Sequence, residues 1–152
     1  MSEVLLAAAQ TLDAIGVGPW ARGSGAVYPV ANVAHVLGVV ALVGAIGILD
    51  LRIAGAWRDL PQDRLSRALT PVAVVGLAIM VVSGFVLFAA DGAALSRSGV
   101  FQLKLALIAL ALANAALFRW RAGAGAAARP LAMLSIGLWV AVVIAGRMIA
   151  YS

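Results

Sequence analysis

The sequence predicts an all-α integral membrane protein, in which an antiparallel four-helix bundle follows a short N-terminal interfacial helix. The first observation is composition: the 152-residue chain is 64% hydrophobic and 11% charged, whereas a soluble domain is roughly half apolar and about one quarter charged. The second is the presence of four apolar runs, each close to the roughly 20 residues that cross a bilayer. The third is that short segments connect these runs, so that each helix returns beside its predecessor. We therefore expect a single transmembrane domain over residues 1–152.

The excess of basic residues indicates how the chain is oriented in a membrane. There are 11 Lys and Arg against 6 Asp and Glu, and the basic residues lie mainly in short segments between the apolar runs. No cysteine is present, which excludes disulfides, thiolate catalysis and c-type haem attachment. The expected partner is thus the lipid bilayer, and nucleic acid is not expected.

The chain begins with a predicted interfacial helix over residues 3–15, where apolar residues recur at helical spacing. This run is too short to span a membrane. Its first residues include Glu3 and no basic cluster, so it does not read as a cleaved signal peptide. Four glycines and Pro19 between residues 16 and 25 then predict a loop.

The four spans are predicted over residues 29–49, 69–90, 100–118 and 131–151, with a short turn over 91–99. Pro29 suits the first turn of a helix, where its missing N–H would have no partner anyway. The connections after the first and third spans carry Arg52, Arg58, Arg64, Arg67, Arg119, Arg121 and Arg129. The positive-inside rule therefore places both connections in the cytoplasm of a bacterial inner (plasma) membrane, with both termini outside.

One polar residue from each span falls in the outer half of the predicted bundle. His35, the only histidine, lies six residues beyond Pro29, or about 9 Å into the outer leaflet. Ser83, Lys104 and Arg147 lie at similar depths on the other three spans. Because ionisable residues are costly inside a membrane, such residues are functional candidates.

Structural explanations of these residues stay open. Lys104 and Arg147 can extend to the headgroups, and Ser83 can bond a carbonyl of the preceding turn. A neutral His35 can hold two helices together by an interhelical hydrogen bond.

A second polar group is predicted at the cytoplasmic end of the bundle. Asp50 and Arg52 end the first span, and Asn114 lies about one turn inside the third. We interpret these three residues as a structural cluster that holds the helices together.

Two kinds of ligand suit the outer polar layer. For b-type haem, His35 is the expected metal ligand, Met148 the opposite axial ligand, and Lys104 and Arg147 partners of the propionates. Gly84 and other small residues would make room for the macrocycle.

For an anionic or quinone-like ligand, His35, Lys104 and Arg147 would bind the polar group, with Trp139 and Tyr151 as walls. The favoured function is an electron-transfer-associated membrane subunit that binds b-type haem or a quinone in the outer leaflet, as a homo-oligomer or within a larger membrane complex. The alternatives are a small transporter or ligand-binding membrane protein, and a cofactor-free accessory subunit. No nucleophile–base pair is visible, so no catalytic residue is expected.

The spaced motifs of the chain resemble a known group of proteins. The pattern YP, HVLG and DLRIAG, followed by F-x-x-K, Asn114 and a final W with GRMIAY, is similar to an uncharacterised family of bacterial four-helix inner-membrane proteins. It is more distantly similar to copper-resistance D-type and cytochrome b-type membrane domains. The first resemblance implies a fold and a topology, and the second implies haem or copper. The chain departs from the second pattern because it has a single histidine.

Overall fold

The structure, a computed structural model, describes residues 1–120 and 128–151. All regular structure within these ranges is helical, which confirms the predicted class. Four of the described helices are long and apolar enough to cross a membrane. They are α3 (Val27–Ala54), α4 (Gln62–Arg97), α5 (Gly99–Trp120) and α6 (Ala128–Met148), the last continued by the short 3-10 helix η1 (Ile149–Tyr151). Arg121, counted above among the loop charges, lies outside the described residues.

The N-terminal region contains two helices, α1 (Ser2–Ala14) and α2 (Val17–Gly23), which meet at 76°. The loop expected over residues 16–25 is therefore wrong for 17–23. Gly16, at φ +85°, makes the turn between the helices. Pro19 lies in the first turn of α2, where its missing N–H breaks no helical hydrogen bond.

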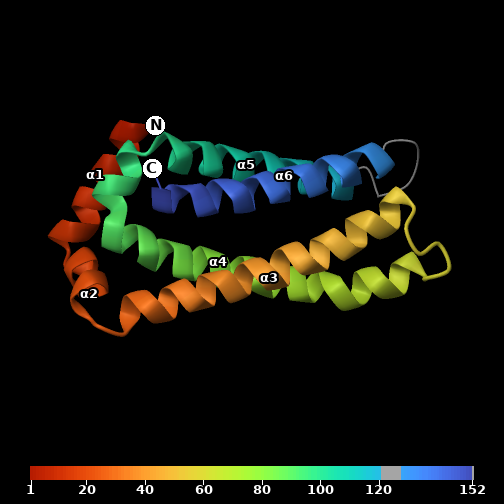
Figure 1. Ribbon diagram of the computed structural model, residues 1–152, viewed down its shortest axis with the longest axis horizontal. Coiled ribbons are helices and arrows are strands. Elements are labelled where there is room, and N and C mark those ends of the chain that lie inside the picture. The colour runs from red at the N-terminus through yellow and green to blue at the C-terminus, as the bar shows by residue number, and fades with distance from the viewer. Residues whose placement is uncertain (121–127, 152) are drawn as a thin grey trace.

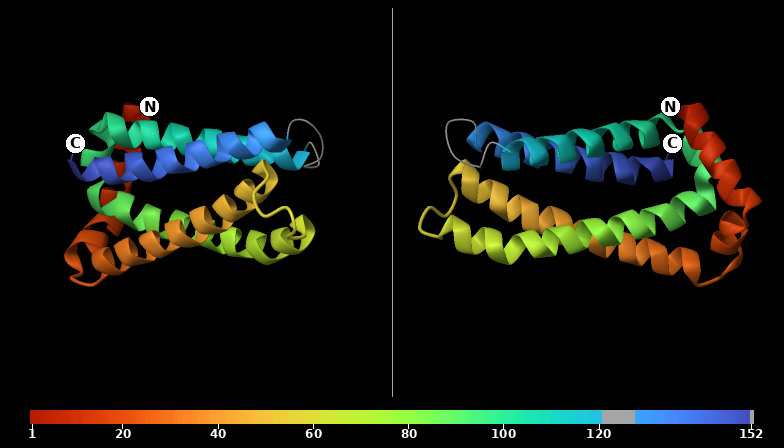
Figure 2. Two further views of the ribbon diagram at one scale, coloured as in Figure 1. Left: turned by 45° about the vertical axis from the view of Figure 1, so that its right-hand side comes forward. Right: turned by 180° about the vertical axis from the view of Figure 1, so that it is seen from behind.

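The long helices lie in two layers (Figures 1 and 2). One layer contains α3 beside α4 and the other contains α5 beside α6, while contacts between α3 and α6 join the two. Helices α4 and α5 diverge from their common turn, next to which Phe88 stacks on Phe101 with ring centroids 5.8 Å apart. The N-terminus and η1 lie at one end of the molecule, and the α3–α4 connection lies at the other, together with the end of α5 and the start of α6.

Two glycines bring α3 and α4 into close contact. A Cβ atom added to Gly76 would lie 2.6 Å from the backbone nitrogen of Leu42, and one added to Gly38 would lie 2.9 Å from the carbonyl oxygen of Gly76. No atom lies within 4 Å of a Cβ added to Gly44, one of the small residues in the same helix. The close approach is thus confined to one face of α3, as expected where dispersion drives helix packing in lipid.

Helix α4 continues past the predicted span end at residue 90 and bends at Asp91, whose φ and ψ are −121° and 20°. The turn expected over residues 91–99 is therefore wrong, because the chain stays helical as far as Arg97. Arg22 of α2 donates to the carbonyl of Ala90 at 3.0 Å and pairs with Asp13 at 2.9 Å. The bend thus exposes a carbonyl that ties α1 and α2 to the end of α4.

Candidate functional site

The outer polar layer contains one direct contact between two of its predicted members. Nδ1 of His35 lies 3.0 Å from the hydroxyl oxygen of Ser83, across the α3–α4 interface. The Ser83 hydroxyl lies 2.6 Å from the carbonyl oxygen of Ile79 and donates its proton there. Because that hydroxyl has one proton, His35 donates from Nδ1, which leaves Nε2 as an acceptor.

The other three predicted residues do not join this pair. Lys104 is half-buried against α6, with Nζ 3.4 Å from the position of a Cβ on Gly146. Arg147 is exposed, donates to the Tyr151 hydroxyl at 2.7 Å and lies 5.1 Å from the centre of that ring. Met148 is 50% exposed. Arg147 and Met148 therefore face the surface of the protein.

The space that small residues were expected to leave for a macrocycle is filled. A Cβ on Gly84 would lie 3.2 Å from Cε1 of His35, so this glycine accommodates the imidazole itself. The space beside Gly38 is also filled, because α4 packs closely against this glycine.

At the opposite end of the bundle, the predicted cluster of Asp50, Arg52 and Asn114 separates into two parts. Arg52 donates from Nε to the carbonyl of Leu60 at 2.8 Å, and from a terminal nitrogen to the carbonyl of Arg58 at 3.1 Å. It therefore fixes the α3–α4 connection. Asp50 and Asn114 instead border a cavity.

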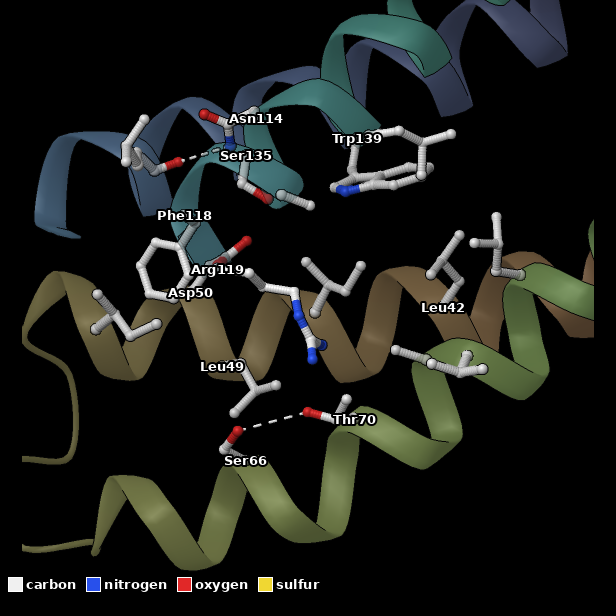
Figure 3. A pocket seen from close by; sticks show the side chains of 18 of the residues that line it. Leu42, Leu49, Asp50, Ser66, Thr70, Asn114, Phe118, Arg119, Ser135 and Trp139 are labelled. Carbon is white, nitrogen blue, oxygen red and sulfur yellow. Dashed lines mark hydrogen bonds between the residues drawn. The ribbon is translucent and has the colours of Figure 1, made fainter. Parts of the chain in front are cut away.

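This cavity, about 360 Å³ in volume, lies between the α3–α4 layer and the α5–α6 layer (Figure 3). Its walls are mainly apolar, with Leu42 and Leu49 from α3, Ala73 and Val74 from α4, and further apolar residues from α5 and α6. Pockets that bind small molecules have volumes of about 300–1,000 Å³ and mainly apolar walls. The inner cavity, as we call it, therefore has the size and lining of a ligand site.

Three residues that line the inner cavity each contain a buried polar atom with no hydrogen-bond partner among the described residues. These atoms are Oδ2 of Asp50, Oδ1 of Asn114 and Nε1 of Trp139, in residues that are 9%, 7% and 3% exposed. Buried polar groups are nearly always hydrogen-bonded, and an unmade bond costs about 1–3 kcal/mol. Three such atoms in the lining residues of one cavity make these side chains candidates for contact with a polar group of a ligand.

The remaining contacts hold these side chains in place. The amide nitrogen of Asn114 donates to the carbonyl of Leu131 at 3.1 Å, which links α5 to α6 and leaves the amide oxygen free. Ser135, itself buried on α6, interacts with the Asp50 side chain. Asp50 comes from α3, whereas Asn114, Ser135 and Trp139 come from the opposite layer (Figure 3). The site thus requires both layers.

The inner cavity reaches the surface of the protein. Val74 of α4 and Leu112 of α5, which both line it, are 59% and 41% exposed. Exposed residues of both helices therefore form part of the cavity lining. Gln62 and Arg119, also exposed, line it at the end that carries the basic connections.

These features define a class: a small helical protein with four helices apolar enough to cross a membrane and a polar-edged cavity between them. No family model, curated protein or solved structure matches the sequence. The family resemblance given above therefore stays a prediction.

Proposed function

We propose that this chain is a multi-pass protein of the bacterial inner membrane that binds a small, mainly apolar molecule in its inner cavity. The bundle is antiparallel, α1 lies along the outer surface of the membrane, and both termini face away from the cytoplasm. The observation that carries the proposal is that three residues lining one cavity of about 360 Å³ contain buried polar atoms with no hydrogen-bond partner in the described part of the chain. This function belongs to the ligand-binding or transport class rather than to enzymes.

The charge distribution supports a cytoplasmic position for the cavity. Arg119 lines it directly, and Arg52, Arg58 and Arg64 lie at the same end of the molecule. Because cytoplasmic connections are enriched in Lys and Arg, the cavity lies in the inner leaflet. The exposed lining residues Val74 and Leu112 then face molecules that are dissolved in that leaflet.

Ligand binding is expected to shift the NMR signal of the Trp139 indole N–H, which is unpaired in the inner cavity. The chain has four tryptophans, so a ¹⁵N–¹H spectrum in maltoside micelles contains four indole signals. Titration with phenylbutanol and with phenylbutylamine should move the Trp139 signal saturably, and Trp139→Phe identifies that signal. Trp120, which is 87% exposed, provides the reference for detergent effects.

A variant that fills the cavity provides the matched control. Ala115 lines the inner cavity and is half-buried, so Ala115→Phe should abolish the shift while the other indole signals stay in place. If neither probe moves the Trp139 signal, the proposed function is wrong.

Haem binding through His35 is the second candidate; the His35–Ser83 hydrogen bond favours it, whereas the filled space at Gly84 argues against it. Histidines that bind metals usually donate their other ring N–H to a neighbouring group, as His35 does to Ser83. Protein purified after growth with added haem should then show a Soret band that His35→Ala removes and Ser83→Ala weakens. A spectrum without this band would exclude the haem hypothesis and leave the inner cavity unaffected.

A further inference from the structure

The inner cavity points to a particular class of ligand, an inference that rests on the proposed function. We propose that the ligand is an amine: a protonated primary ammonium group on an apolar body, with the ammonium paired to Asp50. Three features favour an amine: the balance of donors and acceptors in the cavity wall, the position of Asp50 and the charges around it.

Among the residues that the structure describes, Asp50 is the only acidic one that lines the cavity, and it forms no ion pair. In the described part of the chain, its Oδ2 atom is without a hydrogen bond and Ser135 is the side chain that interacts with it. An uncompensated buried charge costs several kcal/mol, which a ligand cation would offset. Arg52, two residues away, donates to the α3–α4 connection instead.

The unpaired atoms favour a ligand head that is rich in donors. Two of the three, in Asp50 and Asn114, are acceptors, and one, in Trp139, is a donor. An ammonium group carries three N–H donors and no acceptor, so it suits a wall in which acceptors outnumber donors. The Trp139 N–H is left for a water or an oxygen on the body of the ligand.

Arg119 is the other charged side chain in the wall, and its position differs from that of Asp50. Arg119 is exposed, whereas Asp50 is 9% exposed. Solvent and headgroups screen an exposed charge far more than a buried one. Arg119 therefore repels an ammonium at Asp50 only weakly, and it can pair with an anion at the opening.

The ammonium group can come from two sources with the same chemistry. One is a free amphiphilic amine that enters from the inner leaflet. The other is the headgroup of an aminophospholipid, whose phosphate would lie near Arg119 and whose acyl chains would lie against the exposed lining residues Val74 and Leu112. Both sources place the ammonium at Asp50.

Two probes with one apolar body separate charge from shape. In maltoside micelles, phenylbutylamine should bind at least about tenfold more tightly than phenylbutanol, because it forms charge-assisted hydrogen bonds to Asp50. Asp50→Asn, which keeps the size of the side chain, should reduce amine affinity to the level of the alcohol and leave alcohol affinity unchanged. Asp59→Asn, in the exposed α3–α4 connection, should change neither affinity.

The outcomes distinguish this inference from the proposed function. If both probes bind equally, or if Asp50→Asn keeps the preference for the amine, the amine inference is wrong while the cavity remains a ligand site. If neither probe binds, both proposals are wrong. Phosphatidylethanolamine added to the micelles should compete with phenylbutylamine if the lipid is the source, and phosphatidylglycerol should not. Lack of competition by either lipid identifies a free amine.

Discussion

Replacing Asp50 with leucine should stabilise the ligand-free protein and abolish amine binding at the same time. Asp50 is buried, and Oδ2 has no partner, so the folded state carries the full desolvation cost of that atom. Apolar replacement of buried charges stabilises proteins by about 1–4 kcal/mol in favourable cases. The free energy of unfolding, measured by circular dichroism as sodium dodecyl sulfate is added to maltoside micelles, should rise by an amount in this range.

The opposite signs of the two effects identify a binding residue. Removal of a side chain that only holds the helices together would lower the stability of the protein. Removal of a side chain that is kept for a ligand should instead weaken binding and raise the stability. Asp59→Leu, in the exposed connection, should change the free energy of unfolding by less than about 0.5 kcal/mol. A marked loss of stability in Asp50→Leu would show that Asp50 has the structural role that the sequence suggested, here through its interaction with Ser135 of α6.

The helices could be predicted from the sequence because a lipid environment offers no hydrogen-bond partners to the backbone. Each span must pair all its backbone groups internally, so a long apolar run becomes a helix whatever its neighbours are. The ends of the helices are harder to predict from the hydropathy pattern, because a helix can continue into the aqueous phase with polar residues. Helix α4 begins at Gln62 rather than 69 and passes Asp91 to reach Arg97 for this reason.

The candidate site could be predicted only in part, because depth along a helix does not fix rotation about its axis. His35 and Ser83 lie at the same depth and face each other, but Arg147 lies at that depth and faces outward. Asp50 and Asn114 were recognised as polar residues at one end of the bundle. Their convergence on a cavity with Trp139 depends on the spacing of the two layers, which no local pattern encodes.

Substitution of alanine at Gly76 should destabilise the protein, whereas substitution at Gly47 should not. A Cβ on Gly76 would lie 2.6 Å from the backbone nitrogen of Leu42 and 2.9 Å from the carbonyl oxygen of Gly38. Backbone atoms cannot relieve the contact by a change of rotamer, as a flexible side chain can. Helices α3 and α4 must therefore move apart. Overpacking of this kind costs roughly 1–3 kcal/mol, which the same unfolding measurement should detect.

Gly47 provides a matched control with the opposite expected sign. It also lies inside a long helix, and no atom lies within 4 Å of a Cβ added there. Alanine at this position should stabilise α3 by about 0.5–1 kcal/mol, because glycine loses more conformational entropy in a helix. Since Leu42 lines the inner cavity and packs at this contact, Gly76→Ala should also weaken amine binding, whereas Gly47→Ala should leave it unchanged. Equal stability of the two variants would contradict the close α3–α4 contact on which the shape of the cavity depends.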